Sequence, residues 1–121
     1  MPYENTWETK GVYRRYRDSV TGQEILEALR EVHGHVLFDS VRYVINDLLD
    51  ITEHDVSHLE IKTIAAFDRA AALTNPNIKV AVVATMPTIQ NMASMYSESI
   101  NNTPYLCEIF TNLDEAREWV K

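Results

Sequence analysis

The run IKVAVVAT, residues 78–85, constrains the fold more than any other part of the chain. It is almost wholly apolar, rich in β-branched residues, and preceded by Asn75-Pro76, which ends the segment before it. A short apolar run without alternation is typical of a strand in a parallel sheet, because such a strand is covered on both faces. We therefore expect an α/β protein with this strand near the centre of its sheet.

The segments around this strand carry alternating strand and helix patterns. Thr21 and Glu24 form a capping box before a helical repeat, and Gly34 suits a left-handed stop, so we expect a helix over 22–33. Asn112 is a candidate cap for the last helix. Further helices are predicted over 56–75, from Pro87 and after 112, and further strands over 3–8, 12–17, 41–49 and 105–111.

This order predicts a mixed sheet of about five strands with four helices. The N-terminal strands form an antiparallel hairpin, and the later strands belong to parallel βαβ units with right-handed crossovers. The strand in 41–49 is expected to end near Asn46-Asp47. No linker, repeat or low-complexity segment interrupts the 121 residues, so we expect one domain over 1–121.

Composition argues against several classes of function. With 18 acidic and 11 basic residues, the formal net charge of −7 makes nucleic acid and membrane surfaces poor partners. No apolar run approaches the ~20 residues of a membrane span, and no apolar signal core begins the chain. Cys107 is the single cysteine, which suits a reducing compartment, and it fits a small apolar strand residue. We expect a cytoplasmic protein.

Residues 50–60, DITEHDVSHLE, stand out for acids, two histidines and one serine. Ligands of open α/β sheets bind beyond the carboxyl ends of the strands, where this segment is expected. The candidate ligand edge comprises Asp47, Asp50, Asp55, Ser57, His58 and Thr85. The simplest interpretation is a helix that begins near Asp55, with acids in its first turn and a capping box from Ser57 to Glu60 or from Thr52 to Asp55.

Metal binding and catalysis have weaker support. His54 and His58 stand four residues apart, the spacing of two zinc ligands on one helix face, but HDVSH is not His-Glu-x-x-His. If the helix begins near Asp55, His54 lies outside it and the spacing loses its meaning. We find no nucleophile elbow, phosphate loop or dinucleotide fingerprint. We predict a non-enzyme without cofactor or metal.

Methionines gather around the helix that follows the apolar strand. Met86, Met92 and Met95 occur there together with Tyr96. Methionine adapts to irregular cores and to apolar ligands alike, so these residues predict either core packing or a small apolar pocket under the helix.

The order of the elements and three segments carry a resemblance to a known family; the segments are INDLLDITEHDVSHLEIKTIA, NIKVAVVA and IFTNLDEAREWV. They resemble the STAS / SpoIIAA-like superfamily, more closely its small branch of uncharacterised bacterial proteins. The resemblance implies helices stacked mainly on one side of the sheet. In related anti-sigma-factor antagonists a partner kinase phosphorylates a serine in an Asp-Ser-Ser-Gly motif. Asp55 and Ser57 match two positions of that motif, whereas Val56 and His58 replace the first serine and the glycine.

Three functions therefore remain open. The resemblance favours a non-enzymatic binding or regulatory module that engages another protein. Related SpoIIAA-like and Sec14-like proteins are associated with apolar or lipid ligands, so the alternative is a carrier or sensor of a small apolar ligand. A weak metal-dependent enzyme is the third. A homodimer formed through an exposed sheet edge is compatible with each of these three functions.

Overall fold

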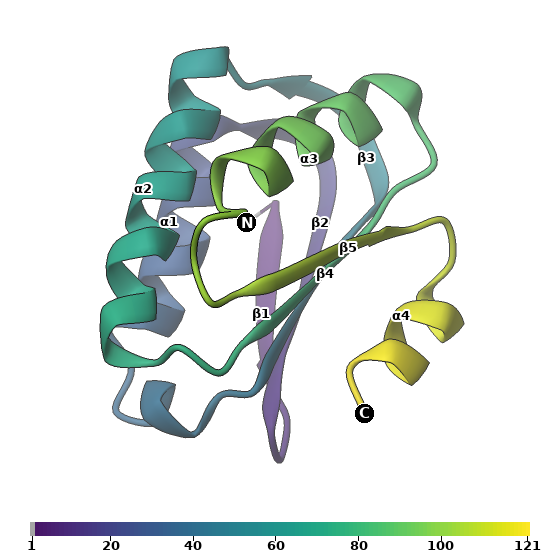
Figure 1. Ribbon diagram of the computed structural model, residues 1–121. Coiled ribbons are helices and arrows are strands. Elements are labelled where there is room, and N and C mark those ends of the chain that lie inside the picture. Colours follow the sequence, from purple (N-terminus) through teal and green to yellow (C-terminus); the bar gives the residue numbers. More distant parts are fainter. Residues whose placement is uncertain (1) are drawn as a thin grey trace.

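The computed structural model describes residues 2–121, which form a single five-stranded sheet with helices on both faces (Figure 1). Strand β1 is antiparallel to β2, and every later pair of neighbours is parallel, which confirms the predicted mixed sheet and its N-terminal hairpin. The strands lie side by side in chain order: β1 (Tyr3–Trp7), β2 (Gly11–Thr21), β3 (Tyr43–Asp55), β4 (Lys79–Val83) and β5 (Leu106–Phe110).

Three helices cover one face of the sheet, and the fourth packs against the other face (Figure 1). The three are α1 (Gly22–His33), α2 (His58–Thr74) and α3 (Pro87–Ser99), and the fourth is α4 (Leu113–Trp119). A short 3-10 turn, η1 (Phe38–Ser40), precedes β3. All four predicted helices are present. No helix within residues 2–121 has the length and apolar character needed to cross a membrane.

Local capping explains where the helices begin. The Thr21 hydroxyl accepts from the backbone N–H of Glu24 at 3.2 Å, and the Ser57 hydroxyl accepts from that of Glu60 at 3.1 Å. Each glutamate reaches back to the N–H of its cap residue, so both capping boxes are complete. Gly34 ends α1 with φ −86°, so the predicted left-handed stop is wrong, because the chain continues in right-handed turns toward η1.

Strand β3 is much longer than its sequence suggests. It was expected to end near Asn46-Asp47 but continues to Asp55, and β2 likewise continues to Thr21. The extra residues pair in parallel, with Asp55 opposite Thr21, while β4 ends opposite Asp47. Acidic residues are unfavourable in strands. This part of β3 is nevertheless a strand because most of its acidic side chains face water, Ile51 is buried, and its backbone groups bond to β2.

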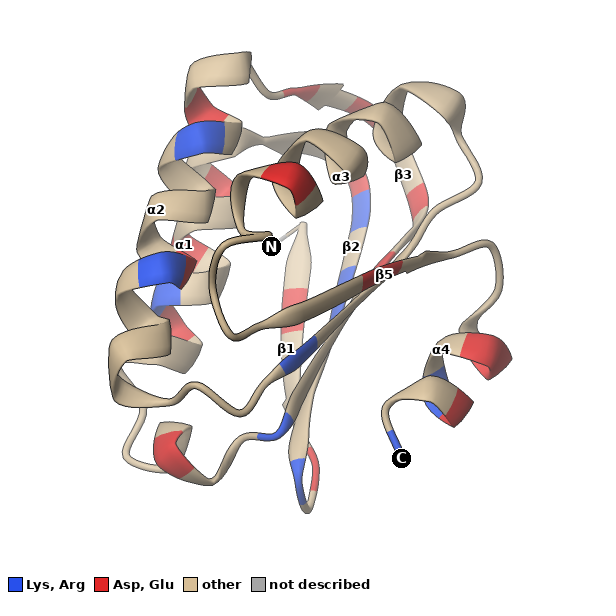
Figure 2. Cartoon of the chain, viewed as in Figure 1, with Lys and Arg blue, Asp and Glu red and all other residues tan. Residues whose placement is uncertain are grey.

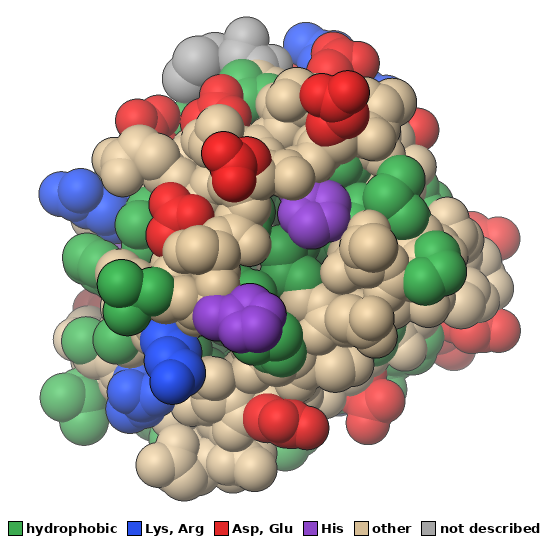
Figure 3. Space-filling view, turned by 90° about the horizontal axis from the view of Figure 1, so that it is seen from above, with side chains coloured by type: hydrophobic (Ala, Val, Ile, Leu, Met, Phe, Trp, Pro, Cys, Tyr) green, Lys and Arg blue, Asp and Glu red, His purple; other side chains and the backbone are tan. Residues whose placement is uncertain are grey.

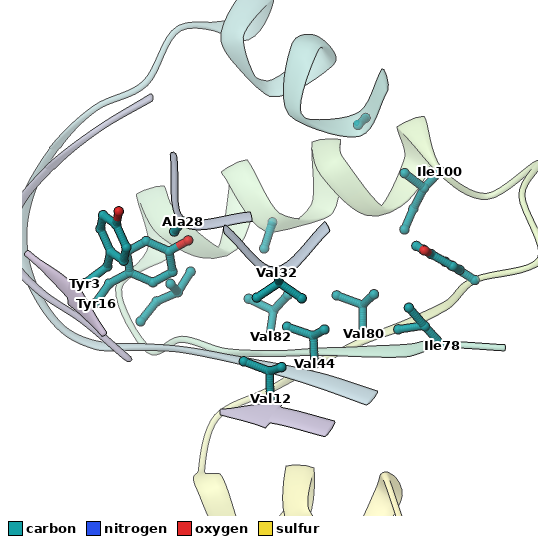
Figure 4. Packing of buried hydrophobic residues seen from close by; sticks show 14 of the residues in the cluster. Tyr3, Val12, Tyr16, Ala28, Val32, Val44, Ile78, Val80, Val82 and Ile100 are labelled. Atoms are coloured by element: carbon teal, nitrogen blue, oxygen red, sulfur yellow. The ribbon is translucent and has the colours of Figure 1, made fainter. Parts of the chain in front are cut away.

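The apolar strand β4 is covered on both faces, as its sequence predicts. Val80 and Val82 face the main core under α1, α2 and α3, where Figure 4 shows them beside Val32 of α1. Ala81 and Val83 face a smaller cluster closed by α4. The two-sided burial places β4 and the first half of β3 at the centre of the molecule.

Candidate functional site

Asp47 and Asp50 lie within β3 rather than beyond its end. Asp47 is buried, accepts a hydrogen bond from the Tyr13 hydroxyl, and accepts another from the N–H of Leu49 at 3.1 Å. Asp50 forms a 2.6 Å ion pair with Arg15 on the surface. The prediction that both carboxylates stand at a strand end is therefore wrong, because β3 continues past them, and contacts with β2 side chains occupy both.

The remaining residues of the predicted edge are exposed. Asp55 is the last residue of β3, Ser57 caps α2, His58 is the first residue of that helix, and Thr85 follows β4. The Ser57 hydroxyl serves as an acceptor for the helix and stays open to solvent. The predicted capping box is confirmed, whereas Asp55 belongs to the strand and not to a first helical turn.

His54 and His58 do not share a helix. His54 belongs to β3 and His58 to α2, so the four-residue spacing does not place both imidazoles on one helical face. The Nε2 atom of His54 lies 3.3 Å from the Thr88 hydroxyl. Among residues 2–121, no three side chains of His, Cys, Asp or Glu converge as metal ligands.

A cavity of about 80 Å³ lies between the sheet and helices α1, α2 and α3. Its walls come from β2, β3, β4 and all three helices, and most of its lining is apolar. The apolar side chains are Ile25, Leu29, Leu48, Ile61, Ile64, Val82, Met92 and Ala93, and the polar ones are Arg14, Tyr16, Asn46, Asp68 and Tyr96. We call this space the central cavity.

Two of the four residues predicted to form an apolar pocket reach the central cavity. Met92 and Tyr96, both on α3, line it. Met86 caps the start of α3 and packs against the main core, and Met95 is half-buried on the same helix without lining the cavity.

Arg14 is the most unusual side chain of the cavity wall, because its residue is only 5% exposed. Its Nε donates to Asn5 Oδ1 at 2.8 Å, its Nη1 to Asn46 Oδ1 at 3.0 Å and its Nη2 to the carbonyl oxygen of Ala28 at 3.3 Å. All three acceptors are neutral, and none of the ion pairs among residues 2–121 includes Arg14.

Asp68 brings a carboxylate to the same wall from α2. One oxygen, Oδ1, lies 3.0 Å from His33 Nε2, and the other accepts from the Tyr96 hydroxyl. Burial raises the pKa of Tyr96 well above its usual value, and the charge of Asp68 raises it further. Tyr96 therefore remains a protonated donor, and both carboxylate oxygens of Asp68 already have partners.

Two buried tyrosine hydroxyls have no hydrogen-bond partner among the described residues. Tyr16 lines the central cavity, and its side chain rises from the sheet beside Ala28 (Figure 4). Tyr105 lines a second cavity of about 20 Å³, whose wall also includes Arg14 and Asp68. Burial raises the pKa of both tyrosines, so both hydroxyls are neutral.

Arg14 and Asp68 were not among the predicted site residues, although the sequence pattern marks both of them. Arg14 lies between Val12 and Tyr16 on one face of β2, so a charge interrupts an otherwise apolar face. Asp68 follows Ile61 and Ile64 at helical spacing on the buried face of α2. A charge at a position where the pattern demands a hydrophobic residue marks a buried polar site.

Cys107 lies half-buried in β5. Burial is the main cause that raises the pKa of its thiol from 9.0 to about 11. The thiol therefore stays protonated at neutral pH and is a poor nucleophile.

The chain was compared with protein families, curated proteins and solved structures. It matches no family model, and no curated protein matches it. An uncharacterized protein of the DUF3478 family from Shewanella loihica PV-4, whose structure is described as SpoIIAA-like, superposes with a TM-score of 0.54 at 10% sequence identity. The superposition covers 98% of this chain and 92% of that chain. At this identity the likeness concerns architecture alone: the chain has a SpoIIAA-like fold.

Proposed function

We propose that the protein is a non-enzymatic binding module that holds a small, mainly apolar molecule in the central cavity. The observation that carries the proposal is the cavity itself, a space of about 80 Å³ between the sheet and three helices that opens to the surface. Protein interiors are close-packed and leave few voids larger than one water molecule. A mainly apolar cavity with a few convergent polar groups is the usual form of a small-molecule site.

The cavity extends to the end of the molecule where α1 and α2 begin. Ile25 and Ile61 lie in the first turns of these helices and line it, whereas Arg14 and Asn46 line it from the middle of the sheet. Viewed from that end, hydrophobic side chains form the floor of a hollow between two histidine side chains (Figure 3). A ligand would enter there, between the helix N-termini.

The volume of the central cavity limits the size of the ligand. A water molecule needs about 10–15 Å³ of such volume, so the cavity has room for roughly five to eight water-sized groups. A short alkyl chain fits this space, and a longer chain would extend through the opening. The sequence resembles the SpoIIAA-like superfamily, whose relatives are associated with apolar or lipid ligands, and this resemblance supports the same class of ligand.

Native mass spectrometry of gently purified protein tests the proposal, with Ala93→Leu as the cavity-filling variant. Ala93 lines the cavity and is buried, so the larger side chain occupies ligand space. Ala70→Leu, at an exposed position of α2, is the matched control. We expect wild type and Ala70→Leu to carry a small-molecule adduct, or to take one up from a mixture of medium-chain alkanols and acids, and Ala93→Leu to lose it. Bare masses for all three proteins in the presence of the mixture would contradict the proposal.

A switch at Ser57 is a second candidate, favoured by the exposure of this serine at the N-cap of α2. Phosphate would gain from the helix N-terminus. It would also meet the Glu60 carboxylate, which lies 2.9 Å from the Ser57 backbone nitrogen, and the acidic positions along β3 (Figure 2). The test compares proteins captured by Ser57→Glu and by wild type. Identical sets would contradict the switch.

Two further predictions concern the protein in the cell. Cytoplasmic localisation stays a prediction, to be measured by fractionation. A homodimer through the β1 or β5 edge stays a prediction too, and light scattering measures it directly.

A further inference from the structure

The central cavity has an excess of hydrogen-bond donors at one place on its wall. A guanidinium carries five N–H groups, and three of those on Arg14 donate to Asn5, Asn46 and Ala28. Two N–H groups remain, and the positive charge has only neutral partners. A buried charge without a counter-ion is costly, which makes an anion a favourable partner at this position.

The Tyr16 hydroxyl adds a further donor at the same place. The residue is only 2% exposed, lines the central cavity, and has no protein partner for its hydroxyl. Burial raises the pKa of Tyr16, while the charge of Arg14 and a side-chain contact with it act in the opposite direction. The hydroxyl is thus neutral, close to the guanidinium and free to donate.

The acidic residue of the wall does not fill this role. Both oxygens of Asp68 are engaged, one with His33 at 3.0 Å and the other with the Tyr96 hydroxyl. No contact within hydrogen-bond distance joins Asp68 to Arg14 among the described residues. The donors of Arg14 and Tyr16 therefore remain for a group that comes from outside the chain.

The rest of the lining is suited to an apolar body. Ile61 of α2, Met92 of α3 and Leu48 of β3 line the cavity along with Ile25 near its open end. A ligand that satisfies the whole cavity has an acceptor or anion at one end and a hydrocarbon portion at the other.

We propose that the ligand is a small monocarboxylic acid with an apolar tail, bound with its carboxylate against Arg14 and Tyr16. The inference rests on the proposed function and specifies its substrate class. Charge-assisted hydrogen bonds from a guanidinium to a carboxylate are short and about twice as strong as neutral ones, so the head group determines selectivity. The tail extends past Ile61 and Met92 toward the opening between α1 and α2.

Calorimetric titration with three probes of one chain length tests the head group. The probes are octanoate, 1-octanol and octylamine, each titrated into the 121-residue protein at pH 7. We expect octanoate to bind about tenfold or more tightly than 1-octanol, because it gains charge-assisted bonds. Octylamine should bind more weakly than 1-octanol, since its ammonium would meet the Arg14 charge.

The Tyr16→Phe variant shows whether the Tyr16 hydroxyl binds the ligand or only supports the structure. It removes a hydroxyl that has no protein partner, so the melting temperature should hold or rise, while the preference for octanoate over 1-octanol falls several-fold. Tyr105→Phe is the matched control, because it removes the other unpaired buried hydroxyl, which lines the second cavity. This variant should keep the full preference for octanoate.

Equal affinities for octanoate and 1-octanol would overturn the carboxylate assignment and leave the cavity as an apolar site. So would a Tyr16→Phe protein that keeps the full preference. If none of the three probes binds and native mass spectrometry finds no adduct, the carboxylate assignment and the proposed function fail together.

Discussion

At the scale of single residues, Arg14 places the strongest demand on its surroundings. Its guanidinium is buried and joins β1 through Asn5, β3 through Asn46 and α1 through the Ala28 carbonyl. Arg15, its neighbour in sequence, points to the surface and pairs with Asp50. The two adjacent arginines therefore differ in what their removal does to stability.

Arg14→Met should lower the free energy of unfolding by about 2–4 kcal/mol, because the half-buried side-chain oxygens of Asn5 and Asn46 lose their donor while much of the side-chain volume is conserved. Urea denaturation measures the change, and Arg15→Met is the control, expected to shift the midpoint little since exposed ion pairs contribute little. Equal losses in the two variants would show that burial of Arg14 is not the source of its effect.

Cys107 gives a prediction that depends on pH. Burial raises its thiol pKa from 9.0 to about 11, so at pH 7.5 the thiolate fraction should be about a hundredfold below that of an ordinary cysteine. Alkylation by iodoacetamide, followed by mass spectrometry, should be slow in the folded protein and accelerate as the pH rises toward 11. Reaction at the rate of the urea-unfolded chain would contradict the buried thiol.

At the scale of elements, the cap of α2 links sequence to stability. Ser57→Ala should lower the free energy of unfolding by about 1 kcal/mol, because the Glu60 N–H loses its acceptor. Ser57→Asp should stay near wild type, since aspartate is an equally good cap. A chemical denaturation curve measures both, and an unchanged midpoint for Ser57→Ala would contradict the capping role.

The two halves of β3 should differ in dynamics. Residues 43–47 pair with β2 on one side and β4 on the other, whereas residues 50–55 pair with β2 alone. Amide hydrogen exchange should therefore be slow in the first half and clearly faster in the second, where fewer contacts oppose local opening. Uniform protection along the whole strand is the result that would count against this difference.

The same strand shows what could and could not be predicted from the sequence. The helix starts at Thr21 and Ser57 were predictable because a capping box is local chemistry within four residues. The length of β3 was not, because its acidic second half is a strand only through pairing with the far end of β2. The burial of Arg14 was missed for a related reason: its partners come from three separate elements.

At the scale of the whole molecule, the layers leave the central cavity unfilled, with the smaller second cavity beside it. Three helices close over one face of the sheet, and α4 seals the centre of the other face (Figure 1). The central cavity lies where α1, α2 and α3 meet above β2, β3 and β4. The SpoIIAA-like fold accounts for these layers, but the side chains of the wall, above all Arg14 and Tyr16, determine what the space accepts.

We propose that a ligand occupies the central cavity, and methyl NMR of the methionines reports on its wall. Met92 lines the cavity, while Met95 lies on the same helix outside its lining and serves as an internal control. During titration with octanoate, we expect a saturable shift of the Met92 methyl signal with little change at Met95. A Met92 signal that stays in place at saturating octanoate, or moves no more than that of Met95, would contradict it.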